Sequence, residues 1–383
     1  MVSFNIGFCA PSARTRYKLV LLDRPAWFLP RIEQEEMAKI GGEAINGWAR
    51  LGESREIDAV NAGLGLSVET LSRVSIAYVA RARHTPDMVE RMAHDADAIA
   101  VTTALVTGEV MDRLPGLRVI GRPGIGVDTV DVEAATARGI AVFSAPGFCA
   151  AEVADHTLMM ALALARKAPV LHSAIRRGVY ERSMSSPMPA ISEMTLGLVA
   201  FGEIAREVAV RAKAFGFTLI ASDPFVAPAI AERYGVALVG LEELLRRSDI
   251  VSVHAPLNKA TFHLLGAREF SLMKPSAYLV NTARGAVVDQ AALIAALQAK
   301  QIAGAGLDVF EREPLEKDSP LTTMENVILT PHMAGVSDSS QVAVRQRTTR
   351  NVAAALVGDW PETRDLVNPD VKGHPRQGRV SAG

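Results

Sequence analysis

Hydrophobic positions in the second half of the chain fall into short and nearly continuous runs. Such runs are typical of parallel β-strands that are covered on both faces. Six of them lie at residues 196–201, 218–222, 250–254, 278–281, 303–309 and 327–330. Most are separated by segments long enough for a helix, so the pattern predicts an α/β fold with a doubly wound parallel sheet.

The first half has a strand–helix alternation of its own. Apolar runs at residues 17–23, 97–103 and 117–123 predict strands, and residues 86–93 and 108–114 have helical spacing. The chain has 383 residues, and at roughly 150 residues per domain this length suggests two or three domains. We therefore predict two α/β domains, each with a doubly wound parallel sheet.

Four further segments complete the pattern. Residues 151–178 are apolar on most faces of a helix and predict one long buried helix. Residues 337–356 predict a final helix, and the polar tail from Val371 onward is expected to be disordered. Residues 41–75 are glycine-rich and show no period that assigns them to an element.

Charge and cysteine content narrow the class of protein. Lys and Arg number 41 against 42 Asp and Glu, giving a net charge of −1, so we expect no nucleic-acid partner and no membrane surface. The two cysteines form no C-x-x-C pair, and we expect neither a disulfide framework nor a metal. The N-terminus lacks a secretory pattern, and no apolar run approaches the roughly 20 residues of a membrane span. We expect a cytoplasmic protein.

A strand, a glycine turn and a helix follow one another in TLGLVAFGEIAREVAV, residues 195–210. In the dinucleotide fingerprint G-x-G-x-x-G, the glycines serve a tight turn, close approach to the pyrophosphate, and helix–strand packing. The three positions here read Ala200, Gly202 and Ala205. The methyl group of Ala200 is the main departure, and we expect it to shift the loop slightly without blocking the phosphates. The turn alone is equally compatible with a helix entry that binds nothing.

A carboxylate follows the next predicted strand, where Asp223 lies 21 residues after Gly202. A carboxylate in this place can accept hydrogen bonds from both ribose hydroxyls of NAD and would repel the 2′-phosphate of NADP. The other interpretation is that Asp223 only opens a turn before Pro224. Together with the turn, Asp223 predicts NAD as the cofactor.

Three polar groups follow three successive predicted strands. Arg284 comes after the strand at 278–281, Glu313 after the strand at 303–309, and His332 after the strand at 327–330. Ligands of open α/β sheets lie beyond the carboxyl ends of the strands. An arginine can grip a carboxylate or carbonyl, a histidine can exchange a proton near neutral pH, and a glutamate can hold the imidazole in place. Each residue alone has a structural explanation, but the three together predict a site that reduces a 2-oxo acid.

The same segments resemble the D-isomer-specific 2-hydroxyacid dehydrogenases over about residues 97–371. The motifs that carry the resemblance are GRPGIGVDTVD, SDIVSVHAPL, MKPSAYLVNTARGAVVD, GAGLDVFEREPL, NVILTPHMAG and LVNPDV. The resemblance implies a Rossmann NAD-binding domain, residues 148–335, inserted into a flavodoxin-like substrate-binding domain, residues 1–147 and 336–383. It also implies a homodimer.

The resemblance assigns roles to residues. Arg284, Glu313 and His332 would be the catalytic trio for interconverting a small 2-oxo acid and its D-2-hydroxy acid. Backbone amides of Gly124, Ile125 and Gly126 would hold the substrate carboxylate together with Arg284. The implied cofactor-binding residues are Gly202, Glu203, Ile204, Asp223, Pro256, Thr282, Ala283, Arg284, Asp308, His332 and Gly335, with Asp308 near the nicotinamide amide.

Two departures bear on specificity and on the loops. Residues 101–105 read VTTAL where phosphoglycerate dehydrogenases can carry arginines for the substrate phosphate, which favours an unphosphorylated substrate such as glyoxylate or hydroxypyruvate. Cys149 stands where the family commonly has Asn, so a loop hydrogen bond is expected to be lost.

Two other classes of protein share part of the pattern. The family's transcriptional corepressors sense dinucleotides and keep the trio, so the trio does not exclude a binding protein. An unrelated nucleotide-binding enzyme, such as a methyltransferase, would leave Arg284, Glu313 and His332 without a role.

Overall fold

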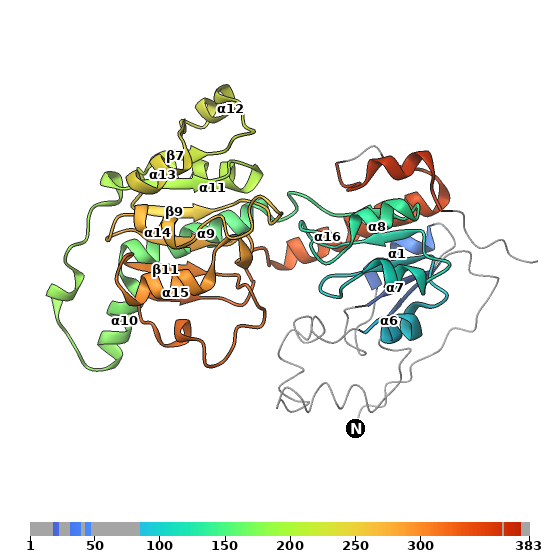
Figure 1. Ribbon diagram of the computed structural model, residues 1–383, viewed down its shortest axis with the longest axis horizontal. Coiled ribbons are helices and arrows are strands. Elements are labelled where there is room, and N and C mark those ends of the chain that lie inside the picture. Colours follow the sequence, from blue (N-terminus) through green and yellow to red (C-terminus); the bar gives the residue numbers. More distant parts are fainter. Residues whose placement is uncertain (1–17, 23–30, 40–42, 47–84, 362–363, 377–383) are drawn as a thin grey trace, which may run out of the picture. The chain divides into compact units, whose positions relative to one another are not determined.

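The computed structural model describes residues 18–22, 31–39, 43–46, 85–361 and 364–376. Contacts between Cα atoms divide the chain into two compact units (Figure 1). Unit 1 comprises Met1–Pro146 and Val342–Gly383, and unit 2 comprises Gly147–Gln341. Most of the unassigned segment 41–75 lies outside the described residues.

Unit 1 is built on a five-stranded parallel sheet with the order β2-β1-β3-β4-β5. The strands are β1 (Lys18–Leu21), β2 (Glu43–Asn46), β3 (Ala98–Ala100), β4 (Val119–Gly121) and β5 (Ala141–Phe143). This is the strand order of the flavodoxin-like doubly wound fold.

Helices cover both faces of this sheet, because its strands alternate buried side chains between two apolar clusters. One cluster joins the strands to α6 (Pro86–Ala93), α7 (Gly108–Asp112) and α8 (Val132–Ala137). The other joins them to α1 (Arg31–Ala38) and to the C-terminal part of α16 (Asp338–Val357). In β4, for example, Ile120 belongs to the first cluster and Val119 to the second.

Unit 2 is built on a seven-stranded parallel sheet with the order β12-β11-β10-β9-β6-β7-β8. The strands are β6 (Thr195–Val199), β7 (Thr218–Ser222), β8 (Ala237–Leu238), β9 (Ile250–Val253), β10 (Tyr278–Asn281), β11 (Gly304–Leu307) and β12 (Val327–Leu329). The chain runs outward from β6 to β8, and then returns to add β9 on the other side of β6. This is the Rossmann arrangement, whose ligand crevice lies where the strand order reverses, between β6 and β9.

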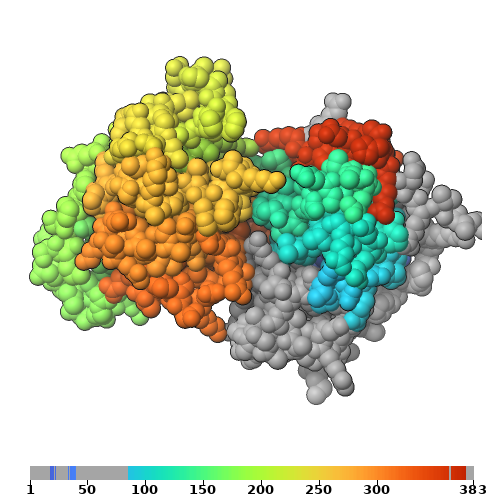
Figure 2. All heavy atoms as spheres, in the orientation of Figure 1, coloured from blue at the N-terminus to red at the C-terminus, as the bar shows by residue number. Residues whose placement is uncertain are grey.

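The helices of unit 2 also form two layers. The helices α9 (Ala150–Ala165) and α11 (Glu203–Ala214) share one apolar cluster with the sheet. The helices α13 (Leu241–Arg247), α14 (Ala267–Leu272) and α15 (Gln290–Gln298) share the cluster on the other face. The short helix α12 (Pro228–Arg233) projects at the outer edge beyond β7 (Figures 1 and 2).

The predicted fold class is confirmed by these two parallel sheets, and the strands predicted at 218–222 and 278–281 have those bounds.

The prediction of a single helix at 151–178 is wrong. The structure has two helices there, α9 and α10 (Ala168–Arg176), separated at Lys167, whose φ of 53° lies in the left-handed region. The apolar pattern continues across Lys167, so the sequence pattern did not indicate that the helix is broken there.

The expected disorder of the tail from Val371 onward is also wrong for its first residues. Val371 is fully buried in the 3₁₀ turn Pro369–Gly373. The Arg376 N–H donates to the Gly139 carbonyl oxygen at 2.8 Å, and the Arg376 guanidinium donates to the Leu117 carbonyl oxygen. Polar composition alone did not reveal these backbone contacts.

Within the described residues, no single helix has the length and apolarity to cross a bilayer, whereas α9 and α10 together pass that criterion as a pair bent by 62°.

Candidate active site

The cofactor turn leads from β6 through Ala200 to α11. Ala200 has a φ of 69°, in the left-handed region, and its N–H donates to the Ser222 carbonyl oxygen at 2.9 Å. Gly202 is the N-cap of α11, and a Cβ built on it would have no atom within 4 Å. The helix N-terminus therefore opens onto space in which a phosphate can approach the backbone amides.

Asp223, at the end of β7, is tied to this turn. Its Oδ2 accepts a hydrogen bond from the Phe201 N–H at 2.8 Å, and its Oδ1 accepts one from the Phe225 N–H at 2.8 Å. The two amides orient the carboxylate beside the turn, and each oxygen retains a lone pair for a further donor. This geometry fits a carboxylate that binds a ribose next to a pyrophosphate.

Glu313 and His332 form a close pair. Oε2 of Glu313 lies 2.9 Å from Nδ1 of His332, and Oε1 accepts a hydrogen bond from the Phe310 N–H at 3.2 Å. The Glu313 side chain is 5% exposed and that of His332 is 33% exposed. The buried carboxylate thus holds one ring nitrogen, and Nε2 is the ring atom on the side away from Glu313.

Asp308 holds the loop that carries His332. This fully buried carboxylate accepts hydrogen bonds from the Thr330 hydroxyl at 2.5 Å and from the Met333 and Ala334 N–H groups at 2.8 Å. The His332 N–H donates to the Asp308 carbonyl oxygen at 2.8 Å. These bonds maintain a φ of 57° at His332, a conformation that non-glycine residues seldom adopt. Asp308 therefore organises the histidine loop, a function that the sequence did not indicate.

Arg284 lies on the loop after β10, which packs against the loop after β11. The Asn281 side-chain amide donates to the Arg284 carbonyl oxygen at 3.0 Å, and the Arg284 guanidinium donates to the Ala283 carbonyl oxygen at 2.7 Å. A Cβ on the next residue, Gly285, would lie 1.8 Å from the Phe310 carbonyl carbon. The glycine therefore allows the arginine loop to touch the segment that leads to Glu313.

Two polar residues of α9, His156 and Thr157, also reach the loops of the candidate site. The sequence did not predict them as site residues. Nε2 of His156 lies 3.0 Å from the Thr330 hydroxyl oxygen and 3.7 Å from Oδ1 of Asp308. The Thr157 hydroxyl lies 2.8 Å from that of Thr282. The available signal for both residues was the polar stretch Asp155 to Thr157, which directly precedes the apolar run of this helix.

The segment after β9 adds a neutral histidine and a proline. Nε2 of His254 lies 2.9 Å from the Ser252 hydroxyl, and burial lowers the pKa of His254 to about 4. The Pro256 carbonyl oxygen accepts a hydrogen bond from the Thr261 hydroxyl at 2.5 Å. At neutral pH this edge of the Rossmann crevice therefore contributes no positive charge from His254.

Gly335 and Cys149 are neighbours in unit 2. A Cβ on Gly335 would lie 2.8 Å from Sγ of the buried Cys149. The absence of a side chain at Gly335 thus makes room for the thiol.

The predicted carboxylate-binding loop, Gly124 to Gly126, belongs to unit 1, whereas the trio belongs to unit 2. The Gly124 N–H donates to the Arg122 carbonyl oxygen at 2.8 Å, and the Gly124 carbonyl oxygen accepts from the Ala145 N–H at 2.8 Å. These bonds close a tight turn and use the Gly124 amide within the loop.

The strand order, the open helix N-terminus and the paired histidine are together typical of a dinucleotide-dependent oxidoreductase. Residues 158–334 match the family model of the D-isomer specific 2-hydroxyacid dehydrogenase NAD binding domain. The chain is 37% identical over 290 residues to a glyoxylate reductase of Thermococcus litoralis, covering 74% of this chain and 87% of the relative. It is 38% identical over 298 residues to a D-3-phosphoglycerate dehydrogenase of Methanocaldococcus jannaschii, covering 77% of this chain.

Among solved structures, the D-lactate dehydrogenase of Aquifex aeolicus complexed with NAD and lactic acid has a TM-score of 0.71 and 27% identity. That match covers 89% of this chain and 96% of the neighbour. The chain belongs to the D-isomer specific 2-hydroxyacid dehydrogenase family, and residues 158–334 match the NAD binding domain of that family. It spans only 56% of the length of the phosphoglycerate dehydrogenase from Methanocaldococcus and 45% of that from Archaeoglobus fulgidus.

Proposed function

We propose that the protein is an NAD-dependent dehydrogenase that interconverts a small 2-oxo acid and its D-2-hydroxy acid. The observation that carries this proposal is the Glu313–His332 pair, at 2.9 Å, on a loop fixed by buried Asp308 within an NAD-binding domain. A proton donor held this firmly next to a hydride carrier suits the reduction of a carbonyl group.

Each member of the trio has one role in the reduction. NADH, when bound, would supply the hydride for the carbonyl carbon. His332 donates a proton from Nε2 to the carbonyl oxygen, and Glu313 stabilises the imidazolium before that transfer and keeps the ring oriented. Arg284 grips the substrate carboxylate or carbonyl through its guanidinium. In the oxidative direction His332 accepts the hydroxyl proton.

The cofactor contacts extend along the carboxyl edge of the unit 2 sheet. Gly202, Glu203 and Ile204 would lie under the pyrophosphate, since they open α11 and a Cβ built on Gly202 would meet no atom of the described residues within 4 Å. Asp223 would bind the adenosine ribose. The residues that would line the rest of the cofactor are Pro256, Thr282, Ala283, Arg284, Asp308, His332 and Gly335.

We assign substrate binding in unit 1 to the loop Gly124, Ile125 and Gly126. The amides of Ile125 and Gly126 would hold the carboxylate, because the Gly124 N–H donates to the Arg122 carbonyl oxygen. The favoured substrates are glyoxylate, hydroxypyruvate and related unphosphorylated acids. Residues 101–105 contain no cationic side chain, and Val101 and Ala104 are buried. That loop therefore provides no charge for a substrate phosphate.

We also propose that the protein is a homodimer. Three large apolar side chains gather at the end of α10 and just after it, with Ile175 56%, Val179 41% and Tyr180 86% exposed. Association of two copies would remove this apolar surface from water. Light scattering after gel filtration should give twice the chain mass, and Tyr180→Glu should shift the protein toward the monomer.

A panel of 2-oxo acids tests the proposed activity. NADH and NADPH are each mixed with the enzyme and with glyoxylate, hydroxypyruvate or a phosphorylated 2-oxo acid, and the loss of reduced-cofactor absorbance is followed. We expect turnover with NADH and a small acid, and little with the phosphorylated one. NADH binding without turnover of any acid would instead identify a dinucleotide-sensing binding protein of the same fold.

A further inference from the structure

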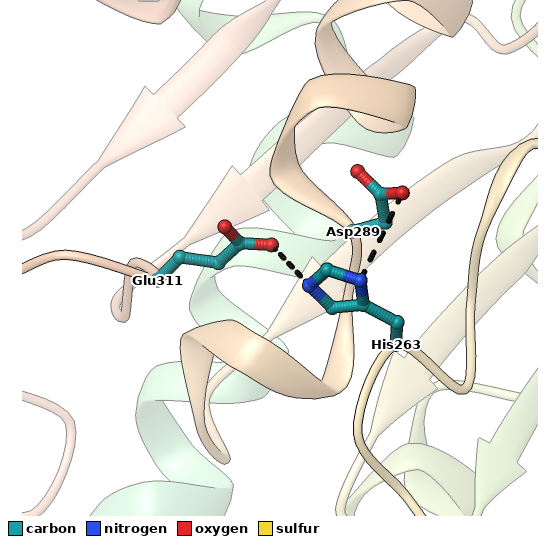
Figure 3. Close-up of side chains that lie close together, drawn as sticks. All are labelled: His263, Asp289 and Glu311. Carbon is teal, nitrogen blue, oxygen red and sulfur yellow. Dashed lines mark ion pairs between the residues drawn. The ribbon is translucent and has the colours of Figure 1, made fainter.

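Another histidine of unit 2, His263, lies between the carboxylates of Asp289 and Glu311 (Figure 3). Nε2 of His263 lies 2.7 Å from Oε1 of Glu311, and its Nδ1 lies 3.9 Å from Oδ2 of Asp289. The three side chains are each about one third exposed, at 34%, 33% and 33%. The ring thus faces one carboxylate with each nitrogen.

The backbone fixes the position of this ring. The His263 N–H donates to the Ala286 carbonyl oxygen at 2.9 Å, and Leu265 forms an isolated parallel bridge with Val288. The Phe262 ring stacks on the imidazole at a centroid distance of 4.0 Å. His263 has a φ of 51°. The imidazole is therefore held against the segment that follows Arg284.

The two carboxylates belong to the loops that carry the trio. Asp289 lies five residues after Arg284 and caps α15 by accepting from the Ala292 N–H at 2.9 Å. Glu311 lies two residues before Glu313, and its Oε1 also accepts from the Gln290 N–H at 2.9 Å. His263 consequently spans the loop of Arg284 and the loop of Glu313.

We propose that His263 is a positioning residue whose imidazolium ties these two loops together and so sets Arg284 against the Glu313–His332 pair. This inference rests on the proposed function of the trio. A neutral imidazole has one N–H and can donate to one carboxylate, whereas the imidazolium has two and can attract both. The 2.7 Å contact with Glu311 has the length of a charge-assisted hydrogen bond.

The arrangement fits a bridge better than a metal site. Zinc bonds to nitrogen and carboxylate oxygen at about 2.0–2.2 Å, so carboxylates that share one ion with an imidazole must both lie on the side of the ring nitrogen that binds the ion. Here Glu311 faces Nε2 and Asp289 faces Nδ1, which places the carboxylates at different nitrogens. Metal binding is therefore an outcome to be tested, and it would contradict the bridge.

The test uses His263→Asn, because Asn also adopts the left-handed backbone region readily but cannot span both carboxylates. Lys300→Asn is the matched control, since exposed Lys300 has a φ of 56° and lies at the other end of α15. With the best substrate of the panel, we expect His263→Asn to lower kcat by about tenfold, less than the roughly 10²-fold that a 1 Å misplacement can cost. KM for NADH and the kcat of Lys300→Asn should stay unchanged.

The pH dependence separates a charged bridge from simple packing. A neutral imidazole has only one N–H and cannot attract both carboxylates, so under the charged-bridge proposal the ratio of wild-type to His263→Asn kcat should shrink toward one as the pH is raised. Glu311→Gln should lower kcat similarly, and the double variant should be no worse than either single variant. A ratio that is independent of pH, or losses that multiply in the double variant, would overturn the proposal. So would stoichiometric Zn²⁺ binding that His263→Asn abolishes.

Hydrogen exchange tests the bridge without any turnover. Exchange in residues 284–289 and 309–314 should be faster in His263→Asn than in the wild type at low pH, and the difference should vanish at high pH. If the wild type reduces no acid of the panel, the proposed function fails while this result still decides whether His263 joins the loops. Equal exchange in both proteins would refute the bridge.

Discussion

Oε2 of Glu313 lies 2.9 Å from Nδ1 of His332, and the carboxylate is almost completely buried. A nearby carboxylate favours the charged form of an imidazole. Glu313→Gln keeps an oxygen for the Phe310 N–H but removes the negative charge. We expect kcat/KM for reduction to begin to fall at a lower pH in Glu313→Gln than in the wild type. Measuring kcat/KM at a series of pH values checks this. The exposed Glu316→Gln is the control, and an unchanged profile in Glu313→Gln would argue against the pair.

Asp223 should set the choice between NADH and NADPH. Its carboxylate is oriented by the Phe201 and Phe225 amides and would repel the additional phosphate of NADPH. We expect kcat/KM to be higher with NADH than with NADPH. Asp223→Asn should reduce the difference between the two values, because it removes the negative charge and keeps one acceptor oxygen. An equal or higher wild-type value with NADPH would show that Asp223 does not select the cofactor.

Ala200 should be replaceable by glycine with a gain in cofactor affinity. Its φ of 69° lies where an L-residue is strained by roughly 1–2 kcal/mol. Ala200→Gly relieves this strain, and the additional entropy of the unfolded chain offsets about 0.4–1 kcal/mol of the gain. We expect thermal stability without cofactor to be equal or slightly higher, and NADH affinity to rise by no more than about tenfold, or 1.4 kcal/mol. Weaker NADH binding in this variant would mean that the methyl group is a fitted part of the turn.

The low pKa of His254 predicts a stability that depends on pH. Burial lowers this pKa from 6.5 to about 4, so between these values the unfolded chain binds a proton that the folded chain does not. The stability that His254 contributes is therefore complete above pH 6.5 and is lost as the pH falls toward 4. The shift corresponds to a free energy on the order of 3 kcal/mol. Urea unfolding at a series of pH values should show a shallower acid loss in His254→Asn, and an identical slope would contradict this prediction.

The sequence predicted the parts of the fold that have a strong local pattern. The β6–Gly202–α11 turn and the polar residues after β10, β11 and β12 were visible because parallel strands end at one edge of the sheet. The break at Lys167 was not visible, because the apolar pattern of α9 continues into α10. The short strand β8, with two residues, was too brief to leave a period.

Long-range hydrogen bonds account for most of what the sequence did not reveal at the site. Asp308 was predicted near the cofactor, but its bonds to the Met333 and Ala334 amides arise only when β11 and β12 lie side by side. His156 reaches Thr330 across 174 positions of the chain. The His263 bridge likewise joins three loops that no local motif connects.

Replacement of the general acid tests the account most directly. His332→Ala removes the group that donates the proton, while the cofactor turn at Gly202 and the carboxylate of Asp223 are untouched. We predict that kcat for the best 2-oxo acid falls by roughly 10²–10⁴, while calorimetric titration shows NADH binding largely retained, because most of the cofactor contacts remain. A His332→Ala enzyme that reduces the acid within a few-fold of the wild-type rate would contradict the proposed mechanism.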